Sequence, residues 1–212
     1  VENKYSLTEY YYGLARANLN KIPSKERNKL RSIHLNNMAF INLKMKHYGK
    51  AYKKWEKAHE LLPSRNRLFN LAFLNLHFAR LDRAEAQFDI LLNGAPQDPD
   101  LLVGSAVLEI LKGRPKIALK KIEKIPATYR DRADIAIYRA LALYEREDLE
   151  KAYLQLSNHE YTTDRHLRSI ADPLKKQIAQ TLEAKRIEEK KKKNARRLPA
   201  EKNVEKGGEG AE

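Results

Sequence analysis

The sequence predicts an all-α protein in which helix pairs stack as an α-solenoid, and two observations lead to this prediction. Two series of alanines recur at intervals of 33, 34 and 34 residues: Ala39, Ala72, Ala106 and Ala140, and, twelve positions later, Ala51, Ala84, Ala118 and Ala152. Only 8 Gly and 8 Pro occur in 212 residues, which leaves few breaks for a strand-rich fold. A fixed period of this length indicates stacked supersecondary units.

Each second-series alanine is followed, one helical turn later, by a large apolar residue: Trp55, Phe88, Ile122 and Leu156. A small residue where two helices cross lets their backbones approach, and a bulky neighbour fills the adjacent groove. One pair cannot cover its own apolar face, so about three or more must stack. The alternative is an irregular helical bundle with accidental periodicity.

Further positions around the alanines follow a known pattern. Met38-Ala39 and Leu71-Ala72 place a large residue before the small one, and Pro63 and Pro96 close two repeats. This register resembles the tetratricopeptide repeat (TPR) over about residues 32–164. The later repeats depart from it at Ser105 and Arg139, and the tyrosine position holds Asn42, Asn75, Glu109 and Leu143. The resemblance implies a right-handed α-solenoid of about four TPR-like helix pairs with N- and C-terminal capping helices.

The elements follow in order along the chain. Residues 1–23 hold an N-terminal helix or degenerate repeat, from Thr8 to Lys21, whose tyrosines Tyr10, Tyr11 and Tyr12 form either an exposed face or a buried cap. Residues 24–164 hold the TPR-like repeats, beginning with a helix from about Lys25 to Lys46 that Ser24 caps.

A capping helix is expected within residues 165–193. Asp172 is its predicted N-cap, Pro173 its first helical residue and Lys192 its approximate end. Residues 194–212 form a basic, Gly/Glu-rich tail that has too few apolar residues to order itself.

The TPR resemblance implies that the first helices line a concave groove for a partner. The candidate groove residues are Asn37, Phe40, Leu43, Lys44, Asn70, Phe73 and Tyr138. The asparagines can donate and accept hydrogen bonds to a peptide backbone, and the phenylalanines can receive its apolar side chains. The alternative for Phe40 and Phe73 is burial between adjacent first helices. The family's carboxylate clamp is not reproduced, since Asn36 and Phe40 occupy its lysine and asparagine positions.

Positive charge is concentrated at both ends of the chain. The net charge is +14, and residues 1–62 carry 13 Lys and Arg against 5 Asp and Glu. Such ends attract an acidic protein, a nucleic acid or an anionic lipid surface without distinguishing them. The C-terminal cluster is either an anion-binding tail or a solvated helix end; it comprises Lys190, Lys191, Lys192, Lys193, Arg196 and Arg197.

No catalytic or metal-binding motif emerges from the sequence. The six histidines form no i, i+4 pair, neither GxSxG nor a phosphate loop occurs, and cysteine is absent. The sequence therefore predicts a non-catalytic, cofactor-free scaffold or adaptor that binds a partner protein segment within a larger assembly. The alternative is a basic peripheral adaptor that binds an anionic membrane surface or nucleic acid through its basic N-terminal region and C-terminal tail, although apolar groove positions disfavour nucleic acid.

No run of 18 apolar residues exists, which disfavours an integral membrane protein and leaves peripheral association open. The cytoplasm and, if a signal peptide precedes Val1, the periplasm or envelope both stay open. The partner's identity and the oligomeric state also stay open.

Overall fold

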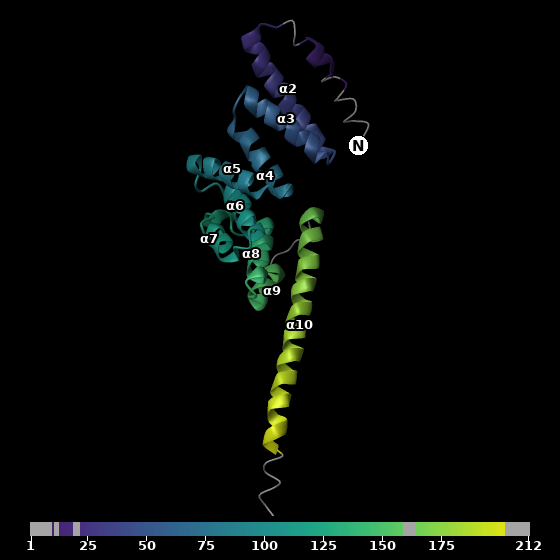
Figure 1. The fold of residues 1–212 in the computed structure, drawn as a ribbon, viewed down its shortest axis with the longest axis vertical. Coiled ribbons are helices and arrows are strands. Elements are labelled where there is room, and N and C mark those ends of the chain that lie inside the picture. The colour runs from purple at the N-terminus through teal and green to yellow at the C-terminus, as the bar shows by residue number, and fades with distance from the viewer. Residues whose placement is uncertain (1–9, 11–12, 19–21, 159–163, 202–212) are drawn as a thin grey trace, which may run out of the picture. The chain divides into compact units, whose positions relative to one another are not determined.

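The computed structural model describes the backbone of residues 10, 13–18, 22–158 and 164–201, where every regular element is a helix (Figure 1). The chain forms two compact units, residues 1–126 and residues 127–212. The first contains a helical stretch at residues 13–18 followed by α2 (Ser24–Lys44), α3 (Tyr48–Leu61), α4 (Arg65–His77), α5 (Leu81–Gly94), α6 (Pro99–Leu111) and α7 (Pro115–Glu123). The second contains the 3-10 turn η2 (Ala127–Tyr129), α8 (Ala133–Glu145), α9 (Leu149–Ser157) and α10 (Arg165–Glu201).

In the first unit, α2 packs on α3, α4 on α5 and α6 on α7, and each pair also contacts the next. Ala39 and Ala51 are fully buried where α2 and α3 meet, and Trp55 is 1% exposed beside them. The same arrangement recurs around Ala72, Ala84 and Phe88 in the next pair. The small and large residues of the sequence register therefore make the interior contacts that their spacing predicts.

Gly104 marks a close approach between neighbouring helix pairs. A Cβ atom added to this residue of α6 would lie 2.6 Å from a ring carbon of Phe88 and 2.7 Å from one of Phe73. Only a residue without a side chain leaves room for both rings at this point. The backbone of α6 therefore packs directly against the aromatic side chains of α4 and α5.

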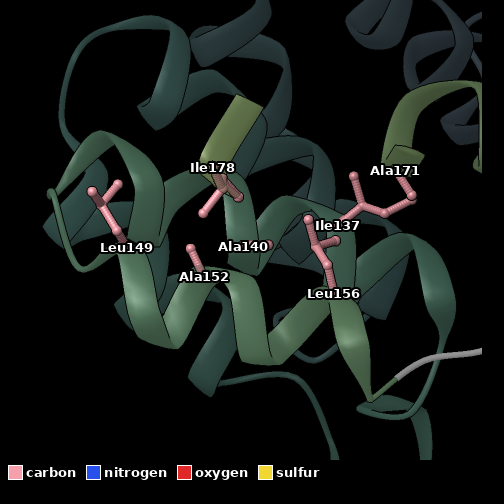
Figure 2. Close-up of a cluster of buried hydrophobic side chains, with 7 residues drawn as sticks. All are labelled: Ile137, Ala140, Leu149, Ala152, Leu156, Ala171 and Ile178. Carbon is pink, nitrogen blue, oxygen red and sulfur yellow. The ribbon is translucent and has the colours of Figure 1, made fainter. Parts of the chain in front are cut away.

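In the second unit, α10 packs on α8 and α9 and completes their core. Figure 2 shows Ala171 and Ile178 of α10 beside the side chains that α8 and α9 contribute. Ala140 and Ala152, from the periodic series, are fully buried in this cluster. The apolar stripe of α10 thus covers the last helix pair, as expected of a capping helix.

The start of α10 differs from the sequence prediction. The helix begins at Arg165, so Asp172 is not its N-cap and Pro173 lies inside it. Asp164 caps it instead, because its carboxylate accepts from the backbone N–H of Leu167 at 3.1 Å. A proline costs a helix one backbone hydrogen bond, and burial of Ala171 and Ile178 on either side favours continuing the helix through it.

The end of α10 also differs from the sequence prediction. The helix continues to Glu201, so the disorder expected from residue 194 is wrong for residues 194–201. Its side chains beyond Leu182 are exposed up to Ala195, and ion pairs support this stretch: Lys185 lies 2.8 Å from Glu147, and Lys192 lies 2.6 Å from Glu188. Glu188 and Lys192 are four residues apart on the helix, and i, i+4 pairs of this kind stabilise a helix without burial. Residues 202–212 of the predicted tail lie outside the described residues.

Helix α2 is slightly displaced from its predicted bounds. Ser24 is its first residue and not its cap, because Pro23 holds the N-cap position and no side chain caps the helix there. The helix ends at Lys44, two residues before the predicted Lys46, since the chain turns at that point. Of the N-terminal tyrosines, Tyr10 is exposed, while Tyr11 and Tyr12 lie outside the described residues.

The turn inside each helix pair has the same backbone geometry. One residue per turn has positive φ, at the repeat spacing: Lys46 (60°), Ala79 (53°), Gly113 (69°) and Glu147 (63°). In the first turn the N–H of Lys46 donates to the Leu43 carbonyl at 2.9 Å, and that of His47 donates to the Asn42 carbonyl at 2.8 Å. These are the two hydrogen bonds of a Schellman motif, and the other three turns repeat them.

Replacing Ala79 by glycine should raise the free energy of unfolding by about 0.5–1 kcal/mol. Positive φ costs an L-residue about 1–2 kcal/mol, and the greater freedom of glycine in the unfolded chain removes part of that gain. Urea denaturation followed by circular dichroism measures the difference. Ala86→Gly, at an exposed position inside α5, is the matched control and should cost about 1 kcal/mol. Equal destabilisation by both substitutions would contradict the prediction.

Candidate functional site

Helix α2 carries a row of residues that its packing on α3 leaves in solvent. Leu30, Ile33 and Phe40 are 39%, 41% and 43% exposed, which is unusual for three large apolar side chains on one helix. Their spacing places them on one face with the half-buried Asn37 and the exposed Lys44. We call these five residues, Leu30, Ile33, Asn37, Phe40 and Lys44, the α2 stripe.

Contacts beneath the α2 stripe hold its centre in place. The Phe40 ring meets Trp55 edge-on, with centroids 5.1 Å apart and planes at 88°. The indole N–H of Trp55 donates to the Asn36 side-chain oxygen at 3.2 Å, and the Asn36 amide donates to the Asn37 side-chain oxygen at 3.5 Å. Phe40 and Asn37 are therefore positioned by the buried tryptophan.

Phe73 has a different environment from Phe40, although both follow a first-series alanine. It is half-buried, and its ring centroid lies 4.7 Å from that of Phe69 and 5.4 Å from that of Phe88. The outermost carbon of the Phe73 ring packs against Gly104. Burial between first helices therefore describes Phe73 better than a groove-facing position does. Leu43 is likewise half-buried and packs against the cluster that contains Trp55.

The remaining candidates lie apart from one another. Asn70 on α4 is half-buried, and its side chain has no hydrogen-bond partner within the described part of the chain. Tyr138 is half-buried on α8, in the second unit; burial and then the Asp134 carboxylate raise the pKa of its phenol. The structure thus places Asn37, Phe40 and Lys44 on one face, Asn70 and Phe73 on a later helix of the same unit, and Tyr138 in the other unit.

The C-terminal lysines extend along the exposed part of α10. Lys190, Lys191 and Lys193 are exposed, and Lys192 is paired with Glu188, whose pKa its hydrogen bond lowers. The side chains of Arg196 and Arg197 lie outside the described residues. Alternating charges of this kind are typical of a solvated helix surface.

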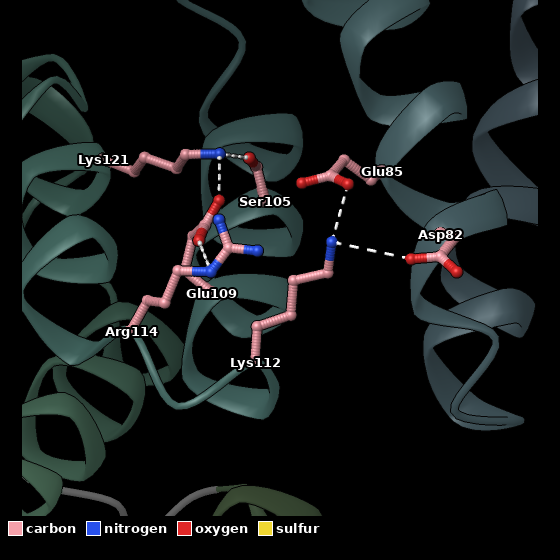
Figure 3. Close-up of polar contacts among 7 residues, drawn as sticks. All are labelled: Asp82, Glu85, Ser105, Glu109, Lys112, Arg114 and Lys121. Carbon is pink, nitrogen blue, oxygen red and sulfur yellow. Dashed lines mark hydrogen bonds and ion pairs between the residues drawn. The ribbon is translucent and has the colours of Figure 1, made fainter.

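A buried polar contact that the sequence patterns did not predict recurs between paired helices. Glu109 of α6 is 4% exposed, and its carboxylate lies 3.1 Å from Lys121 Nζ and 3.6 Å from Arg114 Nε (Figure 3). One pair earlier, the Asn75 amide donates to the Gln87 side-chain oxygen at 2.8 Å. Asn75 and Glu109 hold the tyrosine position of the TPR pattern, and their partners lie twelve residues later in both cases, which is the signal that could have revealed them.

A second polar contact in Figure 3 joins neighbouring pairs. Lys112, at the C-terminal end of α6, lies 2.6 Å from Glu85 and 3.8 Å from Asp82, both on α5. The hydrogen bond from Lys112 lowers the pKa of Glu85, and partial burial opposes the shift. Both polar contacts join helices of this chain to one another, so their role is to fix how the helices pack.

Neither metal binding nor membrane crossing finds support in the described residues. Among them, no group of three or more His, Asp or Glu side chains is arranged to hold a metal ion. None of the helices in that part of the chain combines the length and apolar character needed to span a membrane.

The helix-pair architecture is shared with a solved TPR structure. A tetratricopeptide repeat protein from Parabacteroides merdae is similar with a TM-score of 0.58 and 21% sequence identity, over 84% of this chain and 69% of that protein. The chain has a TPR-like fold. The predicted all-α class of TPR-like helix pairs is therefore confirmed.

A second structure, that of Naa15/Naa10 bound to HypK-THB, contains a chain similar to this TPR-like protein with a TM-score of 0.45 and 20% identity. The match covers 86% of this chain and 28% of that one, so the TPR-like protein spans just over a quarter of its length. No family model matches the sequence, and no curated protein is significantly similar to it.

Proposed function

We propose that this TPR-like chain is a non-catalytic scaffold that binds a segment of a partner protein on the α2 stripe. The observation that carries the proposal is the environment of Phe40. Its ring is 43% exposed and braced edge-on by the buried Trp55. Aromatic side chains fixed in this way are frequent anchors of protein interfaces, because they contribute apolar area without losing side-chain freedom on binding.

The composition of the α2 stripe indicates the kind of segment that fits it. Leu30, Ile33 and Phe40 offer an apolar surface along about three helical turns, at 1.5 Å per residue. Asn37 lies among them and can hydrogen-bond to a peptide backbone, while Lys44 at the end of the helix favours a carboxylate. A segment with apolar residues and an acidic residue at one end matches this order of side chains.

The alternative function is attachment to an anionic membrane surface or nucleic acid through the basic N-terminal region and the C-terminal tail, and the C-terminal part of it has less support. Glu188 neutralises Lys192, and Glu147 binds Lys185 at 2.8 Å. The local charge of α10 is therefore mixed, which weakens attraction to a uniformly anionic surface.

The double substitution Asn37→Ala with Phe40→Ala should weaken partner binding at least about tenfold, or about 1.4 kcal/mol. Removing Phe40 deletes the anchor, and removing Asn37 deletes the polar contact beside it. Affinity purification with crosslinking mass spectrometry identifies partners of the wild-type chain, and titration of a purified partner measures the change.

Ile90→Ala with Asn93→Ala is the matched control, since both are exposed on α5 away from the α2 stripe. The control should bind like the wild type, and circular dichroism should show that both variants stay folded. If every partner binds the folded Asn37/Phe40 variant with wild-type affinity, the proposed site is wrong.

A further inference from the structure

A cleft of about 760 Å³ lies in the first unit, between the helical residues 13–18 and the helices α2 and α3. Six cationic side chains line it, and we call this feature the basic cleft: Arg16, Arg31, Lys50, Lys53, Lys54 and Lys57. Two carboxylates, Glu56 and Glu60, also belong to its lining. Positive charge therefore exceeds negative charge threefold within one concave surface.

The charge of the basic cleft is not balanced internally. None of its six cations forms an ion pair or hydrogen bond with another residue in the part of the chain that the structure describes. Several cations elsewhere in the same unit are paired: Arg65 lies 2.8 Å from Asp98, and Lys112 lies 2.6 Å from Glu85. Unpaired charges lining a concave surface concentrate the field there and attract anions.

The cations approach the basic cleft from three segments. Lys50, Lys53, Lys54 and Lys57 follow the spacing i, i+3, i+4, i+7, so they form one row along α3 about 10 Å long. Arg31 comes from α2 and Arg16 from the N-terminal helical stretch. Burial and then the charges of Arg16 and Lys54 lower the pKa of His34, which also lines the cleft.

The same cleft has an apolar component, supplied by Leu35, Met38 and Leu61. A site that combines these residues with a row of lysines matches a ligand that carries both carboxylates and apolar side chains. Single-stranded nucleic acid is matched less well, because its binding sites use aromatic side chains for base stacking and, among the described residues, no Phe, Tyr or Trp lines this cleft. Its concave form also differs from the flat basic face that suits a lipid surface.

We propose that the basic cleft binds an acidic protein segment in which apolar residues alternate with Asp and Glu. The carboxylates meet the lysine row of α3 and Arg31, and the apolar side chains contact Leu35, Met38 and Leu61. Arg31, Leu35 and Met38 of the cleft lie on a different face of α2 from Ile33, Asn37 and Phe40 of the α2 stripe. The two faces adjoin at His34 and Leu30, which are four residues apart. The residues substituted in the two tests differ and lie on different faces or helices, so either proposal can fail without the other.

Fluorescence anisotropy with the full chain and a labelled peptide of four Asp-Glu-Leu triplets tests this proposal. We expect saturable binding that weakens with added salt, and at least a tenfold loss of affinity in Arg31→Glu with Lys57→Glu. Both residues are exposed, so the fold should persist, which circular dichroism verifies. The matched control is Lys116→Glu with Lys120→Glu, a pair of exposed cations on α7 that makes the same change in net charge.

Further measurements distinguish the proposed acidic peptide ligand from other ligands. A peptide of Asn-Gln-Leu triplets should not bind, and the acidic peptide should raise the pKa of His34 in an NMR titration, because it brings negative charge beside the ring. The Asn37→Ala, Phe40→Ala variant should bind the acidic peptide like the wild type, which separates this test from that of the α2 stripe.

The proposal is overturned if the acidic peptide does not bind, or if the cleft and α7 variants weaken it equally, since net charge alone would then explain the attraction. It is also overturned if oligothymidylate, or vesicles of phosphatidylcholine and phosphatidylserine in equal parts, bind more tightly than the peptide and depend on Arg31 and Lys57. That result would assign the cleft to nucleic acid or lipid.

Discussion

Replacing Trp55 by alanine should lower the free energy of unfolding by about 3–5 kcal/mol. The indole is 1% exposed and fills the space beside Ala39 and Ala51, so its removal leaves a cavity between α2 and α3. The variant also loses the hydrogen bond from the indole N–H to Asn36 and the edge contact with Phe40. Urea denaturation followed by circular dichroism suits this test, because Trp55 is the single tryptophan of the chain and its fluorescence is lost.

Trp55→Phe is the matched control for this prediction. It keeps most of the apolar volume but removes the indole N–H, and should therefore cost less than the alanine variant, about 1–2 kcal/mol. Equal losses for alanine and phenylalanine would show that the hydrogen bond to Asn36, and not packing, determines the stability of the first helix pair.

Replacing Glu109 by leucine should lower the free energy of unfolding by about 1–3 kcal/mol. The substitution removes the carboxylate that binds Lys121 at 3.1 Å and Arg114 at 3.6 Å. Lys121 then keeps only the Ser105 hydroxyl as a partner at a site where its side chain is 23% exposed. The expected loss of stability is smaller than that from breaking a fully buried ion pair, because the side chains of Lys121 and Arg114 both reach solvent.

The fourth helix pair provides a compensating change for Glu109. It holds Leu143 and Gln155 at the positions equivalent to Glu109 and Lys121. The double variant Glu109→Leu with Lys121→Gln should therefore recover at least about half of the loss caused by Glu109→Leu alone. If the double variant loses as much as both single variants added together, the two positions do not interact and the interpretation is wrong. Denaturation of all four proteins completes the cycle.

The sequence predicted the helix pairs correctly because their defining contacts repeat. Ala39, Ala51 and Trp55 have the same packing role as the equivalent residues one and two repeats later. A pattern that recurs in several repeats is less open to chance than a match at a single position. The turn residues with positive φ were harder to predict. They recur at the repeat spacing, but only one of the four, Gly113, is a residue type that favours positive φ.

Signals without a repeat were weaker. Asp172-Pro173 is a good local helix start, yet α10 begins at Arg165 because burial of Ala171 and Ile178 rewards a continuous helix. The helix was expected to end near Lys192, but it continues to Glu201. Ion pairs such as that between Lys192 and Glu188 stabilise this exposed part of the helix. In both places tertiary packing or side-chain pairing outweighed the local pattern.

Phe40 and Phe73 show why the candidate site could be predicted only in part. They hold the same position of the repeat, and the sequence left burial and exposure open for both. Phe73 packs inward because the next helix pair presents Gly104, which has no side chain, to its ring. The corresponding residue for Phe40 is Asn70, which does have a side chain, and Phe40 is 43% exposed.

The sequence by itself determined the all-α class, the repeat length and the residues that pack within each helix pair, because those contacts join residues at fixed short separations. Only the tertiary structure decided which aromatic residue faces solvent, which polar groups are buried as pairs, and that Arg16, Arg31 and Lys57 line one cleft. These features depend on side chains from different helices meeting in space, and no spacing along the chain specifies such a meeting.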